Sequence, residues 1–281
     1  MKQAKRMIWV ILVLVLFMIL KGIEGIYDNS KTSSESLFDD SEEVDVVHEP
    51  FSFEAINVGD FFKESEGTFI LSEIGQNNLL IYNHQRANQR FAPQSTFKIP
   101  NALIGLQVGA VENEEHMKEW DGVLREIDAW NQDHSLKTGF ENSVVWYYQE
   151  MARDIGEEKM NEWLSKISYG NQDSSEGIDQ FWLSSSLEIS PVEQSVFLEK
   201  LVQEDLPFDH EVMQTVKNMM KLIEEEDYTV YAKTGQGSGI GWFVGYVERE
   251  DMKFVFVTNL EGTSVEARDI TIEILKRIWT G

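Results

Sequence analysis

The sequence predicts an α+β fold in which a central antiparallel sheet is built from both ends of the chain, with flanking helices and an inserted helical lobe. Three observations support this prediction. Apolar and polar residues alternate near positions 68–82 and again near 228–259, which predicts strands at both ends. Between positions 95 and 225 the apolar residues follow mainly helical spacing. Apolar residues make up 42% of the chain, which is enough to form a sizeable core.

The individual elements have separate signals. Two strands are expected at Thr68–Ile74 and Asn78–Tyr82, joined by a Gly-Gln-Asn turn. Helical spacing predicts four helices: Ser95–Val108, Asn142–Asp154, Pro191–Val202 (with Ser190 as N-cap) and Val212–Ile223. Three further strands are expected: Tyr228–Lys233, Trp242–Glu248 and Lys253–Asn259.

The C-terminal region adds a helix and a turn. Thr263 and Glu266 form a capping-box signature for a final helix. The four glycines between positions 235 and 241 indicate a flexible turn between two strands. We expect the chemistry in the cleft between the helical lobe and the sheet, because small molecules bind in such concave sites.

The N-terminus reads as an export signal. Lys2, Lys5 and Arg6 precede an uncharged apolar run, Met7–Leu20, and this order is typical of a secretory signal peptide. Cleavage after Gly25 lacks the usual A-x-A sequence, so an uncleaved signal anchor stays open as an alternative. We therefore expect an exported protein of bacterial origin. It would be either secreted or anchored to the outer face of the cytoplasmic membrane, with membrane contact only through this segment.

The chain divides into three parts. Residues 1–27 are the signal peptide or signal anchor. Residues 28–50 are polar, acidic and poor in aromatic side chains, which is typical of a flexible linker. Residues 51–281 are expected to form one folded domain that begins near Phe51.

Composition and charge exclude several classes of protein. The formal net charge of −25 repels phosphate backbones, so nucleic-acid binding is not expected. The absence of cysteine excludes disulfides and thiolate catalysis. The histidines are scattered without the spacing of a metal-binding motif, and we expect no metal. The sequence does not predict the oligomeric state.

Ser95 and Lys98 form the motif with the clearest chemical meaning. Their spacing places both side chains on one face of a helix. A serine hydroxyl is a weak nucleophile until a neighbouring group takes its proton. A lysine can do this only when it is neutral or modified, and burial lowers the pKa of an amine. Alone, the same spacing also fits a helix-capping serine followed by a surface lysine.

Three further motifs bear on this choice. Ser143-Val144-Val145 opens the second helix, where a serine can relay a proton to a leaving group. Lys233-Thr234-Gly235 ends a strand, where a cation and a hydroxyl can bind a substrate carboxylate and glycine permits close approach. Tyr169-Gly170-Asn171 lies in a loop. Each motif alone also has a simpler interpretation, as a cap, an edge-strand lysine or a turn.

Together and in this order, the motifs resemble the class D β-lactamases, a family of the serine β-lactamase and DD-peptidase-like fold. The resemblance covers nearly the whole domain, from Gly67 to Ile278. Its segments are QSTFKIPN at 94–101, WDG at 120–122, NSVVWYYQ at 142–149, YGNQD at 169–173, IDQFWL at 178–183, ISPVEQ at 189–194, AKTGQG at 232–237 and GWFVGY at 241–246. Val145 stands where the class A enzymes would have asparagine.

The resemblance implies hydrolysis of β-lactam antibiotics through an acyl-enzyme on Ser95. Carbon dioxide or bicarbonate would convert the Lys98 side chain into a carbamate that acts as general base in acylation and deacylation, and no other cofactor is implied. Ser143 would be the proton shuttle, with Lys233 as the electropositive group beside it. The implied surroundings of the carbamate are Val145, Trp182 and Leu183, with the Trp182 indole N–H donating to it.

The resemblance also implies how substrate is held. The backbone N–H groups of Ser95 and Gln236 would form the oxyanion hole. Thr234 and Gly235 would contact substrate, and Arg268, at the start of the last helix, would bind its carboxylate. Tyr169, Gly170 and Asn171 would form a structural loop.

Two alternatives stay open. Penicillin-sensing receptors carry a similar domain that is acylated without turnover, although they also have several membrane spans. A penicillin-binding peptidase shares the Ser-Lys pair and the Lys-Thr-Gly strand but typically has asparagine where this chain has Val145.

Overall fold

The computed structural model describes residues 56–183 and 186–280. The expected export signal, the acidic linker and the expected domain start near Phe51 lie outside these residues. Within the described ranges, no helix is both long enough and apolar enough to cross a lipid bilayer.

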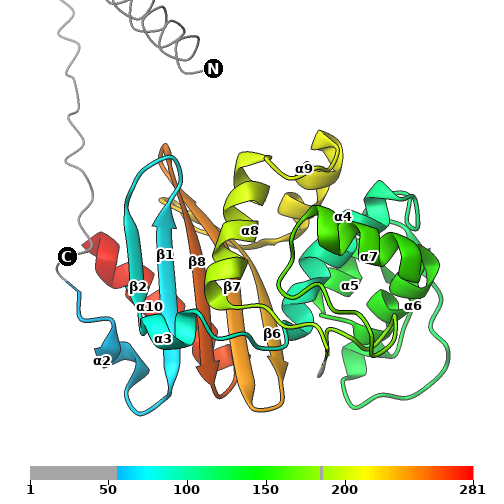
Figure 1. Ribbon diagram of the computed structural model, residues 1–281, viewed down its shortest axis with the longest axis horizontal. Helices are drawn as coiled ribbons and strands as arrows, with labels where there is room; N and C mark the ends of the chain where they lie inside the picture. The colour runs from blue at the N-terminus through cyan, green and yellow to red at the C-terminus, as the bar shows by residue number, and fades with distance from the viewer. Residues whose placement is uncertain (1–55, 184–185, 281) are drawn as a thin grey trace, which may run out of the picture. The chain divides into compact units, whose positions relative to one another are not determined.

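Six strands in the described part form one antiparallel sheet (Figure 1). The spatial order is β2-β1-β8-β7-β6-β5. The bounds are β1 Gly67–Glu73, β2 Leu79–Tyr82, β5 Lys221–Glu224, β6 Thr229–Gly237, β7 Ile240–Arg249 and β8 Met252–Glu261. Because β1 pairs with β8, from Gly67 opposite Leu260 to Glu73 opposite Phe254, both ends of the domain share the sheet as the sequence predicts.

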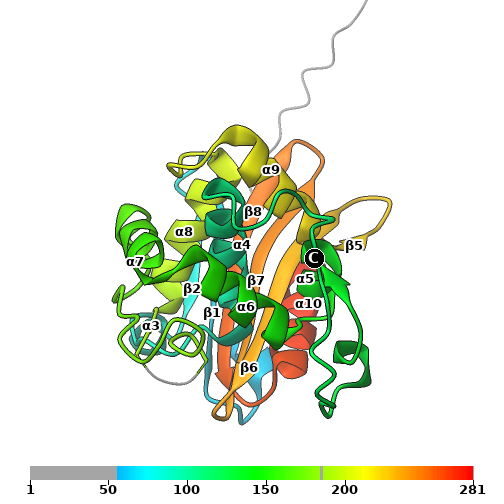
Figure 2. The same cartoon turned by 90° about the vertical axis from the view of Figure 1, so that its right-hand side faces the viewer.

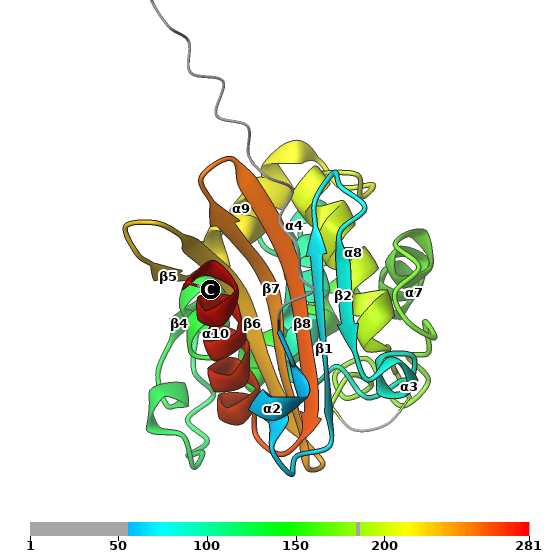
Figure 3. The ribbon, with the colours of Figure 1, turned by 90° about the vertical axis from the view of Figure 1, so that its left-hand side faces the viewer.

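Helices cover both faces of the sheet. Figure 3 shows α10 (Ser264–Thr280) and the short α2 (Gly59–Phe62) on one face. Figure 2 shows the opposite side, where α8 and the helical lobe lie. The elements on that side are α4 Lys98–Gln107, α5 Leu136–Glu141, α6 Val145–Ile155, α7 Glu157–Lys166, α8 Pro191–Gln203 and α9 His210–Met219. Smaller elements complete the chain: α3 His84–Ala87, η2 Gln94–Phe97, β3 Met117–Lys118, η3 Asp128–Trp130 and β4 His134–Ser135.

The two faces of the sheet carry two separate apolar cores. Successive side chains of a strand point to opposite faces, so Phe69 and Leu71 pack toward α10 whereas Ile70 packs toward the lobe. Phe243 and Val244 divide in the same way on β7. The central strands are therefore buried on both sides, and this fixes their register against the helical lobe.

Capping residues fix the start of the two helices that the sequence predicts best, α8 and α10. Ser190 and Glu193 form a reciprocal capping box at the start of α8, with Pro191 in the first turn. Thr263 and Glu266 do the same for α10, where the Thr263 N–H donates to the Glu266 carboxylate at 2.7 Å. Both helices begin where the sequence places them.

Three predicted helices differ from the structure. The helix expected from Ser95 begins at Lys98, because residues Gln94–Phe97 form a 3₁₀ turn. The helix expected from Asn142 begins at Val145, because Ser143 adopts a left-handed backbone with φ of 54°. The helix expected over Val212–Ile223 ends at Met219, and the chain continues as strand β5. The Met220 carbonyl accepts the Ala232 N–H at 2.7 Å, so pairing with β6 replaces the helix. The sequence interpretation also missed α5 and α7.

The expected glycine-rich turn is much shorter in the structure. Gly235 and Gly237 lie in β6 and Gly241 lies in β7, so the turn is reduced to Ser238 and Gly239. A Cβ atom on Gly241 would lie 2.3 Å from the Thr263 carbonyl oxygen, which explains glycine at this position. The β6–β7 hairpin is therefore an extended ladder that reaches the start of α10.

Candidate active site

Ser95 lies in the 3₁₀ turn η2, directly before α4, and Lys98 is the first residue of that helix. The Lys98 Nζ atom donates a hydrogen bond to the Ser95 hydroxyl at 2.9 Å. The preceding residue, Gln94, has a left-handed backbone with φ of 54°, and its N–H donates to the Trp182 carbonyl at 3.0 Å. Ser95 is thus held between the sheet and the 181–183 segment, with its hydroxyl beside an amine.

The Lys98 amine is in a dry environment. Its side chain is 0% exposed, as are the neighbouring Phe97 and Tyr148, and Nζ lies 5.3 Å from the centre of the Tyr148 ring. Burial, and secondarily the charge of Lys233, hold the pKa of Lys98 well below its ordinary value. A lowered pKa favours the neutral amine, which can accept a proton or react as a nucleophile.

Ser143 and Lys233 form a second hydroxyl–amine pair from different parts of the chain. Lys233 Nζ donates to the Ser143 hydroxyl at 2.9 Å and to the Thr234 carbonyl at 3.1 Å. The left-handed backbone of Ser143 directs its side chain to β6, and such strained residues are common at functional sites. Burial lowers the pKa of Lys233 to about 7, so this amine can gain or lose a proton near neutral pH.

A pocket of about 430 Å³ lies where the lobe meets the sheet, in the predicted cleft. It is lined by seven of the predicted site residues: Ser95, Ser143, Val145, Leu183, Thr234, Gly235 and Gln236. Three lining residues were missed by the sequence interpretation: Ile127, Trp130 and Ser264. Ile127 and Trp130 closely follow the WDG segment, and Ser264 follows the capping Thr263. Proximity to these segments is the sequence signal that could have indicated them.

Strand β6 packs directly on the nucleophile turn. A Cβ atom on Gly235 would lie 2.9 Å from the Pro93 carbonyl oxygen and 3.2 Å from the Thr96 backbone nitrogen. A Cβ atom on Gly237 would overlap the side chain of Gln94. Glycine is therefore required for this close approach, which brings Gln236 to the same pocket as Ser95.

The indole N–H of Trp182 is a buried hydrogen-bond donor without an acceptor. Its side chain is 0% exposed and stacks on Phe97, with the ring centres 5.3 Å apart. Within the described residues the Trp182 Nε1–H has no hydrogen-bond partner. A buried unsatisfied donor costs about 1–3 kcal/mol, so an acceptor that is not part of the unmodified chain is expected beside it.

The Tyr169-Gly170-Asn171 loop is held by its own contacts. Tyr169 is fully buried, and Gly170 has φ of 53° with the Glu188 carbonyl against its Cα. The Asn171 side chain donates to the Ser186 carbonyl at 2.7 Å, and its backbone N–H donates to Glu188 at 2.9 Å. These contacts close the loop that carries Trp182.

Comparison with known proteins assigns the family. Residues 63–279 match the penicillin binding protein transpeptidase domain. The probable β-lactamase YbxI of Bacillus subtilis is 55% identical over 225 residues, which cover 79% of this chain and 84% of that protein. A solved structure of a class D β-lactamase from Bacillus subtilis is 53% identical with a TM-score of 0.79, covering 81% of this chain and 97% of that one.

The chain belongs to the class D β-lactamases.

A more distant member of the class D β-lactamase family shows the same relationship. The β-lactamase OXA-48 of Klebsiella pneumoniae is 40% identical over 76% of this chain and 84% of that protein. The family and the α+β fold predicted from the sequence are thereby confirmed. Within residues 56–183 and 186–280, no group of three or more histidine or acidic side chains is arranged to hold a metal ion.

Arg268 is not among the residues that line the pocket of this class D β-lactamase. Its side chain is 44% exposed, and Nε and Nη2 donate to Asp269 at 2.9 and 2.8 Å. Ala267, Thr271 and Ile274 are buried against the sheet, whereas Arg268 lies one helical turn after Ser264 on the more exposed side of α10. The α10 residue that lines the pocket is Ser264, which donates through its N–H and hydroxyl to the Gln236 side chain at 3.0 and 3.1 Å.

Proposed function

We propose that this class D β-lactamase hydrolyses β-lactams through an acyl-enzyme on Ser95, with a carboxylated Lys98 side chain as general base. One observation carries the proposal: a fully buried lysine amine lies 2.9 Å from the hydroxyl of the candidate nucleophile. Only a neutral amine reacts with carbon dioxide, and burial lowers the pKa of Lys98, which favours the neutral form.

The residues around Lys98 fit a carbamate. The unpartnered Trp182 Nε1–H supplies a donor, and the Ser95 hydroxyl lies within hydrogen-bond distance of Lys98. Val145 and Leu183 line the pocket with apolar surface, which limits water around this group. The carbamate would supply an anionic oxygen able to accept a proton from Ser95 and later from water.

Ser95 acts as the nucleophile in acylation. Its oxygen attacks the β-lactam carbonyl, a C–O bond forms, and the C–N bond of the ring breaks. Ser143 gives its proton to the departing nitrogen and regains one from Lys233, which already donates to it at 2.9 Å. The backbone N–H groups of Ser95 and Gln236 would stabilise the negative oxygen of the tetrahedral intermediate.

The substrate carboxylate needs polar partners on the wall of the pocket, besides the predicted Arg268. Thr234 and Ser264 present hydroxyl groups on the wall of the pocket, and Lys233 supplies positive charge when it is protonated. We infer that these three groups together bind the carboxylate, as cations and hydroxyl donors commonly do.

The place of action follows from the N-terminal sequence. We infer that the enzyme is exported by the basic and apolar segment at 1–27 and acts outside the cytoplasmic membrane. Mass spectrometry of the mature N-terminus separates release after Gly25 from retention of a signal anchor.

Reaction with a chromogenic cephalosporin tests the proposed function. The purified enzyme should hydrolyse many equivalents, and Ser95→Ala should hydrolyse none. Consumption of a single equivalent followed by arrest would instead indicate a sensor or a peptidase that stays acylated. The same assay with added bicarbonate should give a higher rate.

A further inference from the structure

Two segments that the sequence analysis singled out have no role in the chemistry proposed above. They are YGNQD at 169–173 and ISPVEQ at 189–194. In the structure one side chain from each segment contacts the other behind the turn that carries Ser95. Tyr169 comes from the first segment and Gln194, on α8, from the second, and their side chains are buried.

A chain of three hydrogen bonds joins these side chains to the turn. The Tyr169 hydroxyl donates to Gln194 Oε1 at 3.3 Å. Gln194 Nε2 donates to the Thr96 hydroxyl oxygen at 2.8 Å, and the Thr96 hydroxyl donates to the Pro93 carbonyl at 2.7 Å. Burial raises the pKa of the Tyr169 phenol, so this hydroxyl keeps its proton and remains a donor. Buried polar groups that are all paired in this way favour one arrangement of the residues they join.

The last of these hydrogen bonds closes the turn around the nucleophile. The Pro93 carbonyl accepts the Thr96 N–H at 3.1 Å as well as the Thr96 hydroxyl. Gln94 and Ser95 lie between these two residues, and Gln94 has the left-handed φ of 54°. Such a backbone is costly for a residue other than glycine and persists only where the surrounding structure holds it. The double contact at Pro93 holds it from one side.

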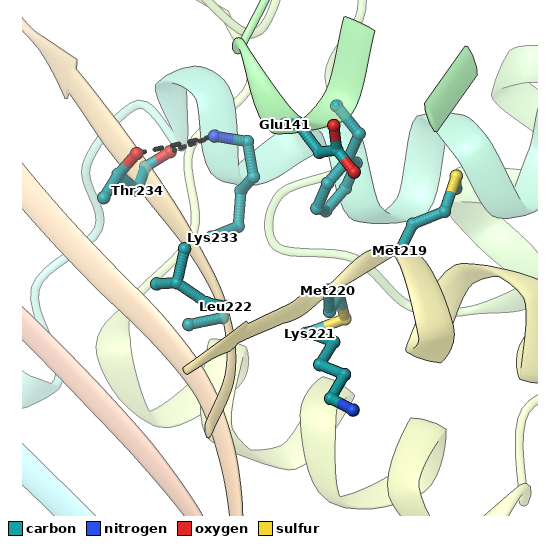
Figure 4. A pocket seen from close by; sticks show the side chains of 9 residues that line it. Glu141, Met219, Met220, Lys221, Leu222, Lys233 and Thr234 are labelled. Atoms are coloured by element: carbon teal, nitrogen blue, oxygen red, sulfur yellow. Dashed lines mark hydrogen bonds between the residues drawn. The ribbon is translucent and has the colours of Figure 1, made fainter. Parts of the chain in front are cut away.

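Strand β6 packs on the turn through apolar contact. A Cβ atom on Gly235 would lie 2.9 Å from the methyl carbon of Thr96. The Lys233 amine of this strand donates to Ser143 and to Thr234, and Figure 4 shows the second of these contacts. The Thr96 methyl group therefore packs on β6, whereas its hydroxyl is bound by the hydrogen bonds that come from α8.

We propose that Thr96, Gln194 and Tyr169 are positioning residues that hold Ser95 in the orientation needed for acylation. The inference depends on the proposed function, in which Ser95 is the nucleophile. Lys98 begins the helix directly after the turn, and its amine lies 2.9 Å from the Ser95 hydroxyl. A turn that relaxes would change this contact, and small misplacements of reacting groups are costly.

Acylation should depend on the turn more than deacylation does. In acylation the free Ser95 hydroxyl has to face both its base and the substrate carbonyl, and only the turn orients it. After acylation the ester bond and the oxyanion hole hold the carbonyl carbon, and water is the nucleophile. A role confined to stability would not separate the two steps.

Thr96→Val and Thr96→Ser test the hydroxyl. Valine keeps the shape of threonine without the hydroxyl, whereas serine retains it. In pre-steady-state kinetics with a chromogenic cephalosporin and saturating bicarbonate, Thr96→Val should slow acylation about tenfold to a hundredfold and deacylation at most about twofold. Thr96→Ser should acylate within about threefold of the wild-type rate, because its hydrogen bonds persist.

Gln194→Leu tests the next link of the chain. Leucine removes both side-chain hydrogen bonds at similar size, so acylation should again slow more than deacylation. The double variant Thr96→Val with Gln194→Leu should acylate no more than about twofold slower than Thr96→Val alone, because changes within one hydrogen-bond network are not additive.

Thr271→Val is the matched control. The Thr271 hydroxyl is also fully buried and contacts Thr258 and the Ala267 carbonyl, but it lies between β8 and α10 on the other face of the sheet. This variant should lose stability as Thr96→Val does, measured as a lower melting temperature, and keep the wild-type rate constants of acylation and deacylation.

The outcomes separate the two proposals. Wild-type acylation in a folded Thr96→Val, or equal slowing of acylation and deacylation, would overturn the positioning role and leave the proposed function standing. The same holds if Thr271→Val slows acylation as much as Thr96→Val. A wild-type enzyme that the cephalosporin does not acylate would overturn the proposed function itself.

Discussion

In the proposed mechanism the reactivity of Ser95 depends on the Lys98 amine, whose pKa is lowered by burial. In the unfolded chain Lys98 carries a proton near neutral pH, whereas in the folded protein burial keeps the pKa of Lys98 well below that of a free lysine. A lowered pKa means that the folded protein holds this proton less tightly than the unfolded chain does, which costs stability below the ordinary lysine pKa. The burial that causes this cost also favours the neutral amine that the proposed reaction needs.

The substitution Lys98→Met separates these two effects. It should lower turnover by about a thousandfold or more, because the general base is lost. In buffer free of carbon dioxide it should also raise the melting temperature near pH 7 by about 2–4 °C or more. The unfolded state binds more protons than the folded state here, so the stabilisation should shrink as the pH rises toward the ordinary lysine pKa. A lower melting temperature near pH 7 would contradict a neutral buried Lys98.

Lys233 should set the alkaline limb of activity. Burial lowers the pKa of Lys233 to about 7, so its positive charge is present below that pH and lost above it. The kcat/KM for a penicillin should therefore fall as the pH rises through about 7. Lys233→Arg stays charged and should remove this limb even if its overall rate is lower. An unchanged alkaline limb in Lys233→Arg would assign the titration to another group.

At the scale of elements, the site depends on the contact between strand β6 and the turn η2. Gly235 permits this contact, because a side chain there would meet the Pro93 carbonyl and Thr96. The same strand positions Lys233, two residues before Gly235, and Gln236, directly after it. A shift of β6 would therefore move several predicted site residues at once.

Gly235→Ala tests this contact. The added methyl group should push β6 away from the nucleophile turn and lower kcat/KM about tenfold to a hundredfold, since small misplacements of catalytic groups are costly. The melting temperature and the far-ultraviolet circular dichroism of the variant should show that the fold persists. Full activity in a folded Gly235→Ala would mean that the close approach is not required.

The sequence predicted elements well where local signals agree with the final packing. The capping boxes at Ser190 and Thr263 mark the starts of α8 and α10 because they satisfy free N–H groups locally. The helix expected over 212–223 failed because pairing with β6, a distant strand, decides the conformation of β5. The left-handed turn at Ser143 is likewise stabilised by the surrounding tertiary structure and has no sequence signature.

At the scale of the whole molecule, the topology brings distant residues into one pocket. The β1–β2 hairpin joins the C-terminal strands, and the helical lobe between them carries Ser95 and Ser143 to the end of β6. The order of motifs made this arrangement predictable. The ion pair between Arg268 and the adjacent Asp269 was not, because such a side-chain contact has no sequence signature. Ile127, Trp130 and Ser264 belong to none of the chemical motifs in the sequence, and only the folding of the chain places them at the pocket.

The most direct test of the account is carbon-13 nuclear magnetic resonance of the enzyme supplied with carbon-13 bicarbonate. We predict a carbamate signal in the wild-type enzyme that is absent in Lys98→Met, and Trp182→Phe should need more bicarbonate to reach the same intensity. Trp242→Phe is the matched control, because the Trp242 indole already donates to the Ala92 carbonyl at 3.0 Å. A wild-type enzyme that turns over β-lactams in saturating bicarbonate without any carbamate signal would contradict the central claim.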